Sequence, residues 1–323
     1  MTAPLGLLAL AVVLSAAGPR WLTRASWPSR APGVAIVVWL GLTSSVFLSL
    51  VLAGVALAVP ELPAGSGFAE FFHACSTALR EHYSTPGGVT LSLLGASAAG
   101  CLLARFAIVA TRQYLRARRE RDAQRALLRY ACESFPEPDV LVLAHATPLA
   151  YCLPGRHGRI VITEGALSVL TQQQLRAVLA HERAHIRARH HLAVLAAAAL
   201  DSALFGMLGT RHAKEAITDL VEMHADDAAH DAAHPARRRD LATAVVLLAG
   251  GSRPAGALGV SGGATMVRVR RLAAPSEPVG WTMRASLLLG ALVMVSLPLG
   301  LAAVPAFAAM LLDYCPIFLD GSH

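Results

Sequence analysis

The stretch that decides the fold is VLAHERAHIRARHH, residues 178–191, in a chain whose residues are 55% hydrophobic. His181 and His185 are four positions apart, so on a helix their rings project from one face, one turn from each other. Glu182 follows the first histidine directly. Two interpretations are open at this point: a zinc site, or a polar seam on a solvated helix.

A helix is predicted to begin at Gln172, because Thr171 and Gln174 have the spacing of a capping box. The helix carries apolar residues at helical spacing and ends near the motif. His190 and His191, which follow the motif, are interpreted as helix-end histidines rather than metal ligands.

Three short β-rich runs precede this helix and predict a small sheet: residues 136–144, 148–154 and 158–163. The strand at Arg159–Thr163 is compatible with an interior place in the sheet. It is equally compatible with an edge that an extended substrate joins by backbone hydrogen bonds. A sheet leading into a long helix with a polar seam indicates an α+β domain.

A catalytic zinc site needs a third protein ligand and one open position. The segment LVEMHADDAAHDAAH, residues 220–234, offers candidates. Glu222 is the predicted third ligand, and Asp226, one turn later, is predicted to support a ligand histidine from the second shell. The alternatives for the third ligand are His224, Asp226 and His230, and His230 with His234 is a candidate rival site.

The predicted chemistry is peptide hydrolysis with one catalytic Zn²⁺ held by His181, His185 and Glu222. Zinc lowers the pKa of a coordinated water toward about 7. Glu182 is placed to take the proton of that water as it attacks a peptide carbonyl. Glu182 is therefore the predicted catalytic base.

Composition indicates a protein of the lipid bilayer. The chain has 323 residues, a mean hydropathy of +0.52 and only 15% charged residues, whereas soluble domains are about one quarter charged. The net charge is +7, and nearly all of the basic residues are arginines, since Lys214 is the only lysine. These arginines lie beside apolar runs, which favours contact with the inner leaflet, and no direct nucleic-acid binding is expected.

Four apolar runs are candidate membrane spans: residues 4–18, 34–59, 89–110 and 285–312. The first is interpreted as a span rather than a cleaved signal peptide, since no basic residue precedes it and Arg20 follows it. Arginines follow the first and third runs, and acids follow the second, which predicts that both termini lie outside. The predicted location is the inner membrane of a bacterial cell.

The predicted fold is an α-helical membrane protein with about four transmembrane helices and a cytoplasmic α+β zincin-like metalloprotease domain between the third and fourth. Residues 1–112 form the N-terminal membrane region with three spans. Residues 113–283 form the peptidase domain. Residues 284–323 form the last span and a short external tail.

A fifth apolar run, residues 192–208, is interrupted by Asp201. If this run crossed the membrane, His185 and Glu222 would lie on opposite sides and could not share an ion. The run is therefore predicted to lie against the inner leaflet or to pack within the domain.

Two smaller signals concern packing and crosslinks. Ser92, Ala96 and Gly100 form a line of small residues on the third span, compatible with packing inside the bundle or with a homodimer interface. Cys75 and Cys315 both fall on the predicted external side. A disulfide between them and two free thiols are both open.

The segment AYCLPGRHGRIVITEGALSVLTQQQLRAVLAHERAHIRARHH, followed by EMHADDAA, resembles the BlaR/MecR-type membrane metallopeptidases and, more distantly, HtpX- and Ste24-type gluzincins. In that family a helix supplies two histidines and a general-base glutamate, and an E-x-x-x-D segment supplies a glutamate ligand and a supporting aspartate. The resemblance implies these roles for His181, His185, Glu182, Glu222 and Asp226. It also implies a cytoplasmic zincin domain between the third and fourth spans.

The chain departs from the BlaR type after its last span, because only a short tail follows Leu312. The C-terminal penicillin-binding sensor domain of that type is therefore not expected. The implied partner is a protein substrate, in some family members a BlaI-like transcriptional repressor cleaved in signal transduction. The alternatives are HtpX-like quality control of membrane proteins and a non-catalytic zincin-like membrane receptor or scaffold.

Overall fold

The structure, a computed structural model, describes residues 2–58, 88–155, 158–207, 209–229, 235–249, 262–274, 277 and 279–313. Several predictions fall outside these ranges. They concern the acidic loop after the second span, the Cys75–Cys315 pair, the rival site at His230 and His234, and the tail after Asp313.

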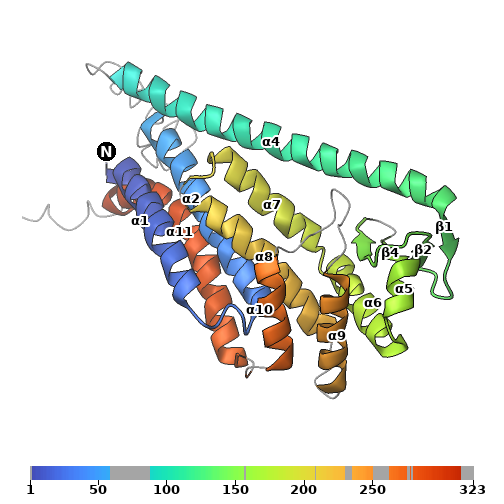
Figure 1. The fold of residues 1–323 in the computed structure, drawn as a ribbon. Coiled ribbons are helices and arrows are strands. Elements are labelled where there is room, and N and C mark those ends of the chain that lie inside the picture. The colour runs from blue at the N-terminus through green and yellow to red at the C-terminus, as the bar shows by residue number, and fades with distance from the viewer. Residues whose placement is uncertain are drawn as a thin grey trace, which may run out of the picture.

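Helices predominate, with one small sheet at the end of the molecule away from the N-terminus (Figure 1). In chain order the elements are α1 (Thr2–Arg24), α2 (Pro32–Ala58), α4 (Gly88–Ala131), β1 (Cys132–Ser134), β2 (Val140–Leu143), β3 (Ala150–Leu153), β4 (Arg159–Thr163), α5 (Glu164–Val169), α6 (Gln172–Arg187), α7 (His190–Ala203), α8 (Thr210–Ala229), α9 (Pro235–Leu248), α10 (Gly262–Ala273) and α11 (Trp281–Asp313).

Four helices among the described residues are long and apolar enough to cross a membrane: α1, α2, α4 and α11. Helices α1, α4 and α11 each contain one of the four predicted spans, and α2 covers the second as far as Ala58, the last described residue there. Helix α4 does not end with its apolar part. It continues through the arginine-rich segment as one helix to Ala131, so that it runs from the helical bundle to the sheet (Figure 1).

The sheet has the order β1-β2-β4-β3, with β2 parallel to β4 and the other pairs antiparallel. β4 (Arg159–Thr163) pairs on both sides, so the interpretation of this strand as an edge is wrong. The edge strand beside the site helix is β3 instead. Val178 and Leu179 of α6 pack on the inner face of the sheet in one buried cluster with Ile160 and Ile162 of β4.

The apolar run 192–208 forms most of α7, which turns back into α8 and does not cross. Helix α7 has 14 residues and is about 21 Å long at 1.5 Å per residue, less than the ~30 Å of a hydrocarbon core. Both helices of the hairpin pack against α2, and α7 also packs against α4 (Figure 1). Of the two predicted placements, against the inner leaflet or within the domain, neither names the contacts found: α7 packs on α2 and α4, two of the candidate spans.

The tip of this hairpin lies deep in the bundle. Leu204 is buried in one cluster with Ala11 of α1 and Val46 of α2. Three residues of the turn have left-handed backbone conformations, with φ of 57° at Phe205, 68° at Gly206 and 75° at Gly209. Such conformations cost little for glycine, which allows the chain to reverse in a short distance.

Arg105 explains how a helix can end at this depth. Its Nε and Nη2 donate to the carbonyl oxygens of Ala203 and Ser202 at 3.1 and 2.7 Å, and its guanidinium lies 3.6 Å from the ring centroid of Phe205. The last carbonyls of a helix have no partner within the helix, and lipid offers them none. An arginine inside the third apolar span thus satisfies the carboxyl end of α7.

Helices α2 and α4 approach closely where Gly54 meets Gly95. A Cβ built at Gly95 would lie 2.6 Å from the carbonyl oxygen of Gly54. Of the predicted small-residue line, Ser92 is buried, whereas Ala96 and Gly100 are exposed. The prediction that the three form one packing seam inside the bundle is therefore wrong, and the contact runs through Gly95.

We expect Gly95→Val to destabilise the protein, because the added atoms would overlap backbone and overpacking costs about 1–3 kcal/mol. Thermal unfolding in a mild detergent measures the effect. Gly100→Val is the matched control, since a Cβ there meets nothing within 4 Å. Equal unfolding temperatures for the two variants would contradict the close approach.

Candidate metal centre

Helix α6 presents the HExxH motif on a buried face. Thr171 accepts a hydrogen bond from the backbone N–H of Gln174, and the Gln174 side chain accepts one from the Thr171 N–H, which confirms the predicted capping box and helix start. His181, Glu182 and His185 are all buried. The interpretation of the motif as a solvated polar seam is therefore wrong.

Helix α8 brings Glu222 and Asp226 to the same place. Its apolar side, with Ile217, Leu220 and Val221, belongs to a large cluster that includes Trp39 of α2. This packing turns the acidic side of α8 toward α6. Glu222 and Asp226 are 2% and 0% exposed, which leaves both carboxylates dependent on buried partners.

Three side chains converge as metal ligands would. The Nε2 atoms of His181 and His185 lie 3.1 Å apart, and each is 3.6 Å from an oxygen of Glu222. Ligands 2.0–2.2 Å from a tetrahedral zinc ion are about 3.3–3.6 Å apart. Among the described residues this is the one group of three or more metal-ligating side chains whose ligand atoms cluster in this way, and its donors fit a catalytic zinc ion.

Asp226 supports the first histidine. Its Oδ1 lies 3.0 Å from Nδ1 of His181, which leaves Nε2 of that ring facing the ligand cluster. Metal-bound histidines commonly have such a carboxylate behind them, and it fixes the tautomer of the ring. The structure therefore places Glu222 among the ligand atoms and Asp226 behind them, as the sequence predicts.

Arg268 is a further residue of the site that sequence reasoning missed. It lies on α10, is 3% exposed, and donates from Nε and Nη2 to Asp226 at 2.8 and 2.7 Å. Its Nη1 donates to Oε2 of Glu222 at 2.8 Å. One guanidinium thus holds both carboxylates in position. The single available signal was a basic residue on an amphipathic segment, VRVRR, which is far from the motif in sequence.

The second histidine is supported by a chain of imidazoles. Nδ1 of His185 lies 2.9 Å from Nδ1 of His190, and Nε2 of His190 lies 2.8 Å from Nδ1 of His224. If each neutral ring donates one proton and accepts one, Nε2 of His185 remains free for a metal. His190 begins α7 and is not among the clustered ligand atoms, but it contacts a candidate ligand, which the sequence did not predict. His224 belongs to this chain and is not among the clustered ligand atoms.

The charges of the cluster follow from its burial and contacts. Burial opposes protonation of His181, but the carboxylates of Asp226 and Glu222 outweigh it and raise the pKa of His181 to about 9. Burial and the neighbouring His181 lower the pKa of His185 to about 3. Burial alone would raise the pKa of Glu222, yet His181 and Arg268 lower it to about 2.

Glu182 faces the edge strand. Burial and a hydrogen bond with Glu182 both raise the pKa of the Cys152 thiol on β3, so the thiol is neutral and is the donor to the carboxylate. The predicted base, the ligand cluster and the free edge of the sheet are therefore adjacent. An extended chain laid along β3 would pass the carboxylate of Glu182.

Membrane-length helices, a small mixed sheet and a buried His-His-Glu cluster beside a glutamate are the features expected of a membrane metallopeptidase. In a comparison with models of known protein families, residues 117–230 match Peptidase family M48. This part of the chain is thus similar to that family. Arg268 lies beyond the matched residues.

Two curated relatives are named protease HtpX homologues. One, from Syntrophotalea carbinolica, is 39% identical over 74 residues, which cover 22% of this chain and 26% of the relative. The other, from Aquifex aeolicus, is 35% identical over 74 residues, covering 22% and 24%. The chain thus spans about a quarter of the length of these relatives, and no solved structure matched it. These matches support the HtpX side of the resemblance seen in the sequence.

We expect Asp226→Asn to lower zinc affinity about 10–100-fold, as loss of an outer-shell partner usually does. The change is nearly isosteric but removes the charge that faces His181. Zinc affinity is measured by competition with a chelator. Asp227→Asn is the matched control, because Asp227 pairs with Arg271 and makes none of the ligand contacts described above; an equal loss there would argue against a specific role for Asp226.

We expect zinc binding to release one proton near neutral pH. His181, with a pKa of about 9, is protonated in the metal-free protein and must become neutral to bind. His185 and Glu222, with pKa values of about 3 and 2, have already lost their protons. Apparent affinity should therefore rise about tenfold per pH unit from pH 6.5 to 8.5. Calorimetry in buffers of different ionisation enthalpy counts the proton, and a pH-independent affinity would contradict this assignment.

Proposed function

We propose that the protein is an integral-membrane zinc endopeptidase. The observation that carries the proposal is the convergence of His181, His185 and Glu222 with Glu182 on the adjoining turn. The Peptidase family M48 match supports it independently. In this proposal the two histidines and Glu222 bind one zinc ion, and Glu182 performs proton transfer.

When bound, zinc supplies a Lewis acid that polarises the scissile carbonyl and acidifies the attacking water. The residues of the chain do the rest. Glu182 accepts the proton of the water and returns it to the leaving amine. Asp226 and Arg268 hold the ligands in place throughout, and the buried setting strengthens every charge interaction in the site.

The substrate proposed is a protein that offers an extended segment. β3 is the edge of the sheet next to α6. Within the described residues no strand pairs with its outer side, so its backbone groups there can add a strand from another chain. Binding in this way would fix the peptide by its main chain and leave sequence preference to neighbouring pockets.

For the biological role, two candidates follow from different observations. The HtpX homologues favour quality control of membrane proteins. The resemblance to BlaR-type peptidases favours cleavage of a cytoplasmic signalling protein, such as a BlaI-like repressor. In either role, the proposed location of the site is the cytoplasmic side of a bacterial inner membrane, with the termini outside, which is the orientation that the loop charges favour. A non-catalytic scaffold is disfavoured, because it would have no need for Glu182.

We expect Glu182→Gln to keep stoichiometric zinc and to lose peptide cleavage by at least about 10²-fold, since an amide cannot accept the proton of water. The measurement is turnover of an unstructured protein such as casein by the purified full-length protein, together with its zinc content. Glu215→Gln, an exposed change on α8, is the control. Undiminished cleavage by Glu182→Gln would remove Glu182 from the mechanism.

The same variant separates the two biological roles. Retained zinc with blocked turnover makes Glu182→Gln a trap for natural substrates. If crosslinking in native membranes recovers misfolded membrane proteins, the quality-control role is supported. Recovery of one soluble DNA-binding protein would support the signalling role instead.

A further inference from the structure

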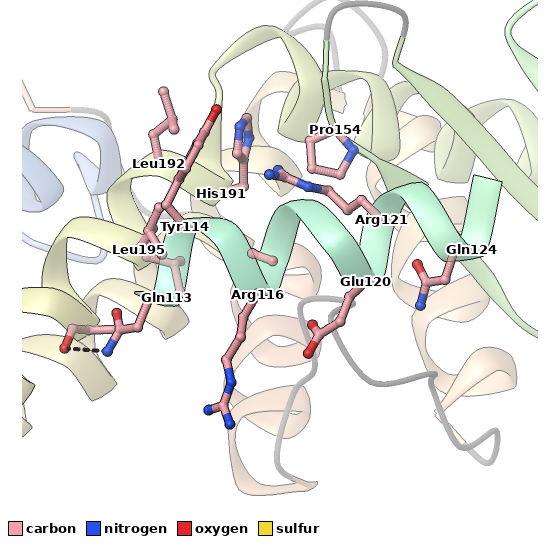
Figure 2. Close-up of a pocket in the computed structure, with 13 residues that line it drawn as sticks. Gln113, Tyr114, Arg116, Glu120, Arg121, Gln124, Pro154, His191, Leu192 and Leu195 are labelled. Atoms are coloured by element: carbon pink, nitrogen blue, oxygen red, sulfur yellow. Dashed lines mark hydrogen bonds between the residues drawn. The ribbon is translucent and has the colours of Figure 1, made fainter. Parts of the chain in front are cut away.

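A cavity of about 300 Å³ lies between α4 and α7, outside the metal centre. Its α4 side is formed by the stretch from Gln113 to Gln124, and its α7 side is largely apolar, with Leu192, Val194 and Leu195 (Figure 2). Pro154, which follows the edge strand β3, closes one end. The volume is at the lower end of the range for small-molecule sites, about 300–1,000 Å³.

The position of the cavity along α4 is that of a membrane–water interface. The apolar run of α4 ends just before Arg112, and the cavity begins at the next residue. Tyr114 lies on its wall and is 44% exposed. Tyrosine and arginine directly after an apolar span are typical of the head-group level of a bilayer. A ligand at this place would meet lipid before water.

One end of the cavity carries the positive charge of Arg121. The Arg121 side chain lies beside His191 and Pro154 (Figure 2). Arg116 and Glu120 also line the cavity, and their charged ends point away from His191 (Figure 2). Asp122 pairs with Arg118 and Arg125, and within the described part of the chain no acidic group pairs with Arg121. Burial, then the positive charges of Arg121 and Arg189, lower the pKa of His191.

His191 also contributes a polar atom that lacks a partner. Its Nδ1 is buried and makes no hydrogen bond in the described residues. A buried ring nitrogen of this kind is costly unless a ligand or water satisfies it. An anionic oxygen between His191 and Arg121 would accept from both.

We propose that this cavity binds an anionic phospholipid of the adjoining leaflet, with its phosphate at Arg121 and His191 and the start of an acyl chain against α7. Basic pockets beside transmembrane helices bind anionic lipid head groups in other membrane proteins. The apolar α7 wall distinguishes this ligand from a free anion, which would gain nothing from it.

The test uses the full-length protein in detergent micelles, titrated with phosphatidylglycerol or with phosphatidylcholine of the same acyl chains, and bound lipid is counted by native mass spectrometry. We expect phosphatidylglycerol to bind at least about fivefold more tightly, and Arg121→Gln to remove about fivefold of that affinity, as expected for one arginine contact. Ala117→Phe, which fills the cavity without changing charge, should abolish retention.

Arg119→Gln is the matched control, because it removes the same charge from the same helix and Arg119 does not line the cavity. Equal loss in Arg119→Gln and Arg121→Gln would overturn the proposal in favour of a diffuse basic surface. Full retention by Ala117→Phe would overturn it too, as would displacement of the lipid by soluble glycerol phosphate, which would indicate a free-anion site.

Thermal unfolding in the same detergent shows whether each variant is folded, and Ala198→Phe on the opposite wall replaces Ala117→Phe if that variant is unfolded. Lipid retention is measured without peptide cleavage. Its outcome is therefore independent of the proposed peptidase activity.

Discussion

One metal ion can be shared by His185 and Glu222 only if the apolar chain between them returns to the side from which it started. The hairpin of α7 and α8 meets this constraint inside the bundle of candidate spans. A reversal at that depth needs left-handed residues in the turn, found at Phe205 and two glycines. It also needs a donor for the last carbonyls of α7, which Arg105 supplies. The proposed ligand set thus gives a reason for Arg105 in an apolar span: it satisfies the end of the helix that has to turn back.

The hairpin makes the metal centre part of the membrane bundle rather than a domain attached to it. One side of α8 packs on α2 and the other carries Glu222 toward α6. His224 continues this link, since a Cβ at Gly33, in the first turn of α2, would lie 3.0 Å from its Nε2. Arg271 of α10 donates to the carbonyl of Ser29 just before α2 at 2.7 Å. A shift of α2 would therefore displace α8 and α10, which both carry residues of the site.

What the sequence predicts well is local. The capping box, the histidine pair and the i, i+4 relation of Glu222 to Asp226 each lie within a few turns of one helix, where periodicity determines which side chains face together. The contacts of Arg268 and of the His185–His190–His224 chain join separate helices, and no local pattern encodes them. The prediction that Arg159–Thr163 could be an edge strand was wrong for the same reason. The β-rich runs have similar sequences, and only the pairing order β2-β4-β3 shows which strand is outermost.

The charges of the cluster are balanced between buried carboxylates and nearby cations. Two carboxylates, Glu222 and Asp226, are buried almost completely, and removing such charges from water costs several kcal/mol each unless cations accompany them. Arg268 and the protonated His181 provide these cations before any metal is present. On binding of zinc as proposed, His181 would give up its proton whereas Arg268 would keep its charge, so each carboxylate would keep a positive neighbour. The Arg268 guanidinium of α10 donates to Glu222 and Asp226 of α8, and Asp226 lies 3.0 Å from Nδ1 of His181 on α6. Charged side chains thus link the three helices that meet at the site.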